Sequence, residues 1–137
     1  LLLAVATPAK RVQEQASEFV DVSGWVDDIR DCYAEARIFI APMQIGTGLQ
    51  NKLLEAMAMK IPSITSKLAN SALCAKDGEE ILIGDTPEDY AAHIVKLLDD
   101  QSFAEQIAVA GFRFVNEKYD WEKATEKLAR VMQQSPA

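Results

Sequence analysis

A short apolar run that leads through a glycine-bearing loop into a helix is the sequence feature that most constrains this fold. The run, at 37–41, is rich in β-branched and aromatic residues, which is typical of a buried strand. The helix after the loop is expected to end near Lys60. In parallel α/β sheets, ligands bind where the chain leaves the carboxyl end of a strand and enters a helix. The sequence therefore predicts a parallel α/β fold with a ligand site at this loop.

Strand-like and helix-like segments alternate along the rest of the chain. Strands are expected at 1–6, 19–23, 37–41, 60–66 and 80–84. Helices are expected at 9–18, 29–36, 47–59, 86–98 and 103–118, with at most one helical turn in 69–74. A last helix is expected to begin at Asp120 and to bury Trp121, Ala124, Leu128 and Val131. This alternation predicts a single domain, residues 1–137, with a doubly wound parallel sheet and C-terminal helices.

The charge and the cysteines exclude several classes of function. The chain carries a net charge of −7 and has no basic run, so neither nucleic acid nor an anionic membrane is expected to bind it. Cys32, Cys74 and His93 form no CxxC or other ligand spacing, which argues against a zinc site or a disulfide framework. A reducing, cytoplasmic location is the default. No segment approaches the roughly 20 apolar residues of a membrane helix.

The loop residues favour an anionic ligand. Gly46 and Gly48 let a ligand approach the backbone closely, and the first amides of the helix attract negative charge. Thr47 and Gln50 have the spacing of a capping box, which predicts that the helix starts at Thr47. Lys52 falls in the first helical turn, where a cation is favoured only if an anion is near. A phosphate group is the expected ligand.

A polar stripe descends from this cap along the helix. Thr47, Asn51 and Glu55 recur at every fourth position and so share one helix face. A carboxylate one or two turns below a phosphate suits the hydroxyls of a ribose or a sugar. Simpler interpretations stay open, because Asn51, Lys52 and Glu55 would also serve as ordinary solvated side chains and Thr47 as a plain helix cap.

Several segments occur together in the order typical of one enzyme family. They are Val22-Ser23-Gly24-Trp25-Val26-Asp27-Asp28, Ala36-Arg37-Ile38-Phe39-Ile40-Ala41-Pro42, Leu54-Glu55-Ala56-Met57-Ala58 with Ile61-Pro62-Ser63-Ile64, Asp77-Gly78 before Ile81-Leu82-Ile83, and Tyr119-Asp120-Trp121. Over nearly its whole length the chain thereby resembles the C-terminal lobe of GT-B-fold retaining glycosyltransferases of family 4, the glycosyl transferases group 1. The resemblance implies a Rossmann-like lobe that binds a nucleotide-sugar donor of a hexose, with no metal ion or other cofactor.

The resemblance also implies roles for individual residues, none of them catalytic. Glu55 matches the second acid of a family pair and is implied to hold the donor's ribose, whereas Thr47 stands where the family has the first acid. The backbone amides implied to contact the diphosphate or the sugar are those of Gly48, Leu49, Gln50 and Asn51. The residues that match the loop bordering the nucleobase are Trp25, Val26 and Asp27. Lys60 stands where the family has a glycine at the end of the helix.

Two parts of the family have no counterpart in this sequence. One is the first strand-helix unit of the lobe, which carries a basic pair for the donor diphosphate, and the other is the N-terminal acceptor lobe. We therefore expect the chain to be a fragment of a two-lobe protein that is inactive alone. Any membrane contact is expected through the missing lobe. The pairing edge left open by the missing strand favours self-association of the fragment.

Rival functions stay open at this point. A non-catalytic nucleotide- or phosphate-binding α/β module would share the fold and the loop, although the match around Glu55 favours a transferase. A receiver-like signalling domain is disfavoured, because Asp27 and Asp28 do not follow the first strand. Trp25 would also serve to cover the edge of a core, and either aspartate to cap the helix that follows.

Overall fold

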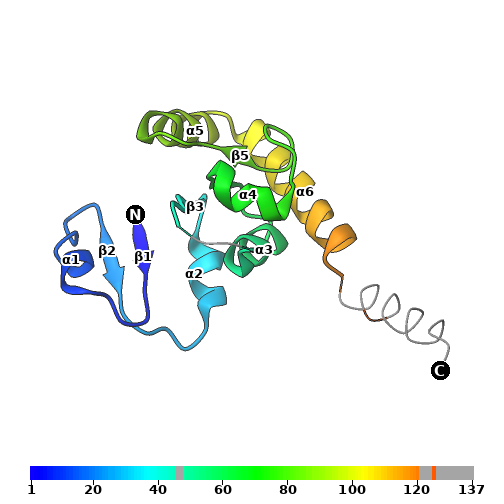
Figure 1. The fold of residues 1–137 in the computed structure, drawn as a ribbon. Helices are drawn as coiled ribbons and strands as arrows, with labels where there is room; N and C mark the ends of the chain where they lie inside the picture. Colours follow the sequence, from blue (N-terminus) through cyan, green and yellow to red (C-terminus); the bar gives the residue numbers. More distant parts are fainter. Residues whose placement is uncertain (46–47, 121–124, 126–137) are drawn as a thin grey trace, which may run out of the picture. The chain divides into compact units, whose positions relative to one another are not determined.

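The computed structural model describes residues 1–45, 48–120 and 125 (Figure 1). Packing divides the chain into two compact units, Leu1–Ala36 and Arg37–Ala137. The expectation of a single domain over 1–137 stays a prediction. The expected buried face of the last helix falls at 121–131, where only residue 125 is described, and so it also stays a prediction.

The first unit contains a two-stranded parallel sheet and two short helices. The elements are β1 (Leu2–Ala4), α1 (Lys10–Gln13), β2 (Asp21–Ser23) and α2 (Ile29–Glu35). In the sheet, Leu3 of β1 lies opposite Val22 of β2. The helix predicted at 9–18 is much shorter, because α1 buries no residue and the chain turns at once into a bridge between Ser17 and Val20. A polar helix without an apolar face has little to stabilise a longer run.

The start of α2 is fixed by Asp28, which settles the choice between the two candidate capping aspartates. The Asp28 carboxylate accepts a hydrogen bond from the Arg30 backbone N–H at 2.9 Å. It also pairs with the Arg30 guanidinium, whose Nη2 lies 2.6 Å from Oδ2. These bonds to Arg30 favour the charged carboxylate and lower the pKa of Asp28 to about 2. Asp28 therefore serves α2 as an N-cap.

The second unit is a three-stranded parallel sheet with helices on both faces. Its elements are β3 (Phe39–Ala41), α3 (Asn51–Ala58), β4 (Ser63–Thr65), α4 (Lys67–Leu73), β5 (Leu82–Ile83), α5 (Pro87–Asp99) and α6 (Gln101–Lys118). The strand order is β3-β4-β5, with Ile64 of β4 aligned between Ile40 and Leu82. The strand-helix alternation and the C-terminal helix α6 agree with the fold class predicted from sequence.

Side chains of alternate strand positions form two separate hydrophobic clusters. The first cluster joins Ala41 and Ile81 to residues of α3, α4 and the last part of α6. The second joins Ile64 and Leu82 to α5 and the first part of α6. In Figure 1, α4 and α5 accordingly lie on opposite sides of β5. This two-sided cover is the doubly wound arrangement that the sequence predicts.

Helix caps follow the sequence signals closely at α5 and less closely at α4. Thr86 and Asp89 form a reciprocal capping box at α5, with Pro87 in the first turn, as the sequence predicts. The backbone N–H groups bound by Asp89 lower the pKa of its carboxyl. The expectation of at most one turn in 69–74 was wrong, because the Ser66 hydroxyl accepts from the Ala69 N–H and starts α4 earlier.

No described helix has the length and apolar character needed to cross a bilayer.

Lys60 adopts the left-handed backbone conformation that the family glycine implies, with φ of 56°. Its ammonium nitrogen lies 4.8 Å from the centroid of the Phe112 ring, so a substitution also removes a cation–π contact. Lys60→Gly and Lys60→Ala lose that contact equally, but only glycine relieves the backbone strain. We expect Lys60→Gly to exceed Lys60→Ala in free energy of unfolding by about 1 kcal/mol, measured by urea denaturation. Equal stabilities would contradict a strained residue here.

Gly111 is a second position at which the backbone geometry determines the effect of a substitution on stability. A Cβ atom there would lie 2.8 Å from the Glu80 carbonyl oxygen and 3.3 Å from the Met57 methyl carbon. Alanine normally stabilises a helix by up to about 1 kcal/mol over glycine. We expect the clash to reverse this gain and Gly111→Ala to lower the free energy of unfolding by about 1–3 kcal/mol. Gln106→Ala, at an exposed position of the same helix, is the control and should stay within about 0.5 kcal/mol of wild type.

Candidate functional site

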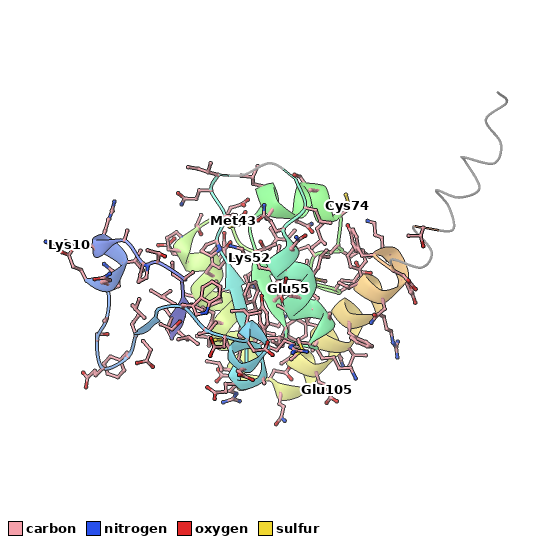
Figure 2. All side chains as sticks on the ribbon, turned by 90° about the horizontal axis from the view of Figure 1, so that it is seen from below. Lys10, Met43, Lys52, Glu55, Cys74 and Glu105 are labelled. Carbon is pink, nitrogen blue, oxygen red and sulfur yellow. The ribbon has the colours of Figure 1, made fainter. Side chains whose placement is uncertain are left out.

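The candidate site lies in the second unit, at the carboxyl end of its parallel sheet. Strand β3 ends at Ala41, and residues 42–50 connect it to α3. Figure 2 labels Met43 on this connection and Lys52 and Glu55 on the helix. Gly46 and Thr47 fall outside the described residues, so the roles expected for them stay predictions. The described part of the loop thus comprises residues 42–45 and 48–50.

The structure corrects the start of the central helix. α3 begins at Asn51, with Gln50 in the N-cap position, so the expected start of the helix at Thr47 is wrong. The Gln50 side chain instead donates from Nε2 to the Gly48 carbonyl at 3.4 Å. The reason is the backbone of Gly48, whose φ of 96° is incompatible with a helical turn. The first amides of α3 are therefore those of Asn51 and Lys52.

Gly48 occupies an open part of the loop. A Cβ atom built on it would meet no described atom within 4 Å outside its immediate neighbours. Its positive φ favours glycine, because an L side chain is strained in that conformation. The backbone at this position is thus open to the close approach of another molecule, as the sequence predicts. Leu49 is exposed and Gln50 is half-buried beside it.

The polar stripe predicted on α3 faces outward. Asn51, Lys52 and Glu55 are exposed, whereas Leu53, Ala56 and Met57 are buried almost completely in the core. Asn51 and Glu55 are four positions apart and so lie on one face of the helix. The exposed face of α3 therefore carries an amide, a cation and a carboxylate close to the helix N-terminus. This set suits a ligand with both an anionic group and hydroxyls.

Two hydroxyls at the end of β4 hold the chain that leaves β3. The Thr65 hydroxyl donates to the Ala41 carbonyl at 2.9 Å, and the Ser66 hydroxyl donates to the Met43 carbonyl at 2.6 Å. Both residues are buried. These contacts were not predicted from the sequence. The position of Ser66 just before a helix was a signal for an N-cap but not for a contact with a loop 23 residues earlier.

A second basic residue at this end of the sheet is already paired. The Lys67 ammonium lies 3.3 Å from the Asp85 carboxylate, and the Lys67 N–H donates to the same carboxylate at 3.2 Å. Both side chains are largely exposed, so the ion pair contributes little to stability. It does reduce the positive charge that α4 presents here.

The residues expected to border a nucleobase lie in the first unit, directly after β2. Trp25 is 76% exposed, Asp27 is exposed and Val26 is half-buried. They follow the carboxyl end of a parallel strand, which is the end of a sheet where ligands bind in this class of fold. An exposed tryptophan ring is available for stacking, so the structure leaves their predicted role open. The alternative that Trp25 covers the edge of a core receives no support from its exposure in this structure.

Two hollows in the described residues lie away from the loop. No three His, Cys, Asp or Glu side chains come together there as metal ligands would. A hollow of about 490 Å³ lies at the other end of the sheet, where Arg37, Lys60 and Pro62 precede β3 and β4. A more open hollow of about 550 Å³ lies along α6 beside Arg113 and Glu117. Neither includes the loop or the exposed face of α3.

A family model matches most of the chain. It is described as glycosyl transferases group 1 and matches residues 2–100. A curated relative, an uncharacterized 44.6 kDa protein in the cps region of Klebsiella pneumoniae, is 28% identical over 102 residues. The alignment covers 74% of this chain but only 26% of that relative, so the chain spans about a quarter of the relative's length.

Solved glycosyltransferase structures share the fold. A glycosyltransferase from Rickettsia africae has a TM-score of 0.79 at 17% identity, covering 98% of this chain and 40% of its own. Anabaena HepE, solved in complex with UDP, has a TM-score of 0.77 at 15% identity, covering 85% and 32%. The C-terminal domain of LpcC, a glycosyl transferase group 1 family protein of Francisella tularensis, has a TM-score of 0.67 at 23% identity, covering 74% and 54%.

The family match and the fold lead to one conclusion. The strand-helix order resembles that of a solved C-terminal domain, as the sequence predicts. The matched residues include the loop after β3 and the whole of α3. The chain therefore belongs to the glycosyl transferases group 1 family and has the fold of the C-terminal lobe of GT-B glycosyltransferases.

Proposed function

We propose that the chain binds the nucleotide-sugar donor in a retaining glycosyltransferase, which moves a hexose from an NDP-sugar to a glycan or lipid-linked acceptor. The observation that carries this proposal is the N-terminus of α3, which follows an open glycine at the carboxyl end of a parallel sheet and presents Glu55 on its exposed face. Family membership and the likeness to HepE in complex with UDP support it.

In this proposal the backbone amides at the end of the loop and at the start of α3 hold the leaving diphosphate. The amides of Gly48, Leu49, Gln50 and Asn51 lie at or before the positive end of the helix dipole, which favours negative charge. They stabilise the charge that develops on the diphosphate as the sugar leaves it. Lys52, in the first turn, adds a positive charge. In this proposal these groups stabilise the diphosphate without a metal ion.

The proposal assigns roles toward the donor to further residues as well. Glu55 lies one turn beyond Asn51 and accepts hydrogen bonds from the two ribose hydroxyls, which fixes the donor's orientation. Trp25, Val26 and Asp27 border the nucleobase. Thr47 contacts the sugar as a neutral hydrogen-bonding group where the family has an acid, and Gly46 gives the backbone room beside it.

Transfer itself is assigned to a larger, cytoplasmic protein of which this chain forms the donor lobe. The curated relative and the solved structures are two to four times longer than the part that this chain covers. We propose that the acceptor and any membrane are bound by an N-terminal lobe. We also propose that the 137-residue chain alone does not transfer sugar and tends to self-associate through an open strand edge.

The ribose role of Glu55 gives a direct test. In the protein encoded by the complete reading frame, Glu55→Ala should weaken the binding of UDP, GDP or ADP, whichever binds best, by about 1–3 kcal/mol, because charged hydrogen bonds are lost. Isothermal titration calorimetry measures this change. Glu105→Ala removes another exposed helix carboxylate, labelled in Figure 2, and should leave the affinity unchanged. An equal affinity of Glu55→Ala and wild type would remove Glu55 from the site.

Inorganic diphosphate separates the phosphate role from the ribose role. It carries the anionic groups of the donor but no ribose. Lys52→Ala should therefore weaken the binding of UDP and of diphosphate by a similar factor, about two- to fivefold for an exposed charge. Glu55→Ala should weaken the binding of UDP but not the binding of diphosphate. Lys10→Ala, at an exposed lysine of α1, is the control for charge alone. A loss of diphosphate binding in Glu55→Ala would contradict a role of that carboxylate limited to the ribose.

A further inference from the structure

The chain that leaves β3 turns sharply before it reaches the candidate site. The Met43 N–H donates to the Ala41 carbonyl at 2.8 Å, which closes a three-residue turn around Pro42. The Ala41 carbonyl also accepts from the Thr65 hydroxyl at 2.9 Å. Met43 packs against the first hydrophobic cluster. We refer to Ala41–Met43 as the loop stem.

Ser66 connects the loop stem to another element. Its hydroxyl donates to the Met43 carbonyl at 2.6 Å and accepts from the Ala69 N–H at 3.3 Å. The residue is only 9% exposed, so water competes little for these bonds. One hydroxyl thus joins the stem of the loop to the first turn of α4. The bond from the Ala69 N–H is sufficient to cap α4. The bond to the Met43 carbonyl therefore has a separate role.

The position of that bond suggests what the role is. The loop is anchored at its far end by α3, whose Leu53 and Leu54 N–H groups both bond to the Gln50 carbonyl. The Ser66 bond anchors its near end. A loop fixed at both ends has fewer conformations to lose when a ligand binds, so a site on it binds more tightly.

We propose that Ser66 is a positioning residue for donor binding: by fixing the loop stem, its hydroxyl holds the segment that presents the amides at the start of α3. This inference rests on the proposed function, because it concerns the same donor site. Ser66 itself touches neither the donor nor the acceptor in this account. Its effect is transmitted through Met43 and the loop stem.

Four variants separate this role from general stability. Ser66→Ala removes both bonds of the hydroxyl. Ser66→Gly also removes them but costs a helix cap only a few tenths of a kcal/mol, so it guards against misfolding of the alanine variant. Ser66→Thr keeps a hydroxyl and should restore the wild-type behaviour. Ser63→Ala is the matched control, because this buried serine lies on β4, three residues before Ser66, and bonds locally to the Ile61 carbonyl at 3.0 Å.

Hydrogen exchange of the unliganded protein tests whether the Ser66–Met43 bond, here called the tether, fixes the loop stem. In the product of the complete reading frame, Ser66→Ala and Ser66→Gly should speed exchange of the Met43 amide about tenfold, with a smaller effect on Leu53 and Leu54. Ser66→Thr and Ser63→Ala should match wild type at these amides. The tether is overturned if the Met43 amide exchanges at the same rate in all variants, or if Ser63→Ala loosens it equally.

Steady-state kinetics then tests the link to donor binding. Ser66→Ala and Ser66→Gly should raise the donor KM and the Kd for UDP about tenfold, with kcat changed less than twofold and the acceptor KM unchanged. Ser66→Thr should restore both values. A looser stem with an unchanged donor KM would overturn the positioning role. If the wild-type protein does not bind UDP, GDP or ADP, the proposed function fails, whereas the exchange rates still decide whether Ser66 tethers the loop.

Discussion

The second unit depends on the burial of β4 between its two neighbours. Ser63, Ile64 and Thr65 are almost fully buried, so every polar group of this strand must find a partner inside the protein. Its backbone bonds to β3 and β5, and its side-chain hydroxyls bond to nearby carbonyls. These bonds fix where β3 ends relative to β4, and so they fix where the loop before α3 begins. The geometry of the candidate site thus follows from a strand that contributes none of its proposed ligand groups.

Much of the fold could be predicted because its signals are local. Thr86, Pro87 and Asp89 specify the start of α5 within four residues, and the apolar run at 37–41 specifies β3. Local signals fail where no packing supports them. The polar segment after Pro8 had a helical pattern but no face to bury, so α1 is a single turn. The predicted length of α1 was therefore wrong. The predicted length of α4 was wrong for another reason, because Ser66 caps that helix and starts it earlier.

The candidate site was predicted less well, because its geometry depends on one backbone angle and on contacts across the sequence. The spacing of Thr47 and Gln50 favours a capping box, but the positive φ of Gly48 delays the helix to Asn51. The bond from Ser66 to Met43 spans 23 residues, and a sequence pattern has no means to indicate it. Asn51 and Glu55, two positions of the predicted polar stripe, are exposed on α3, because the helical period places them on one face.

Helix α6 has a consequence for how this unit loses its structure. Asp100 ends α5 and also caps α6, so no linker separates the two helices. Ile107 of α6 belongs to one hydrophobic cluster and Val115 to the other, on opposite faces of the sheet. Detachment of α6 therefore exposes both clusters at once, and neither face of the sheet can open alone at low cost. The described part of this unit should consequently melt as one cooperative body.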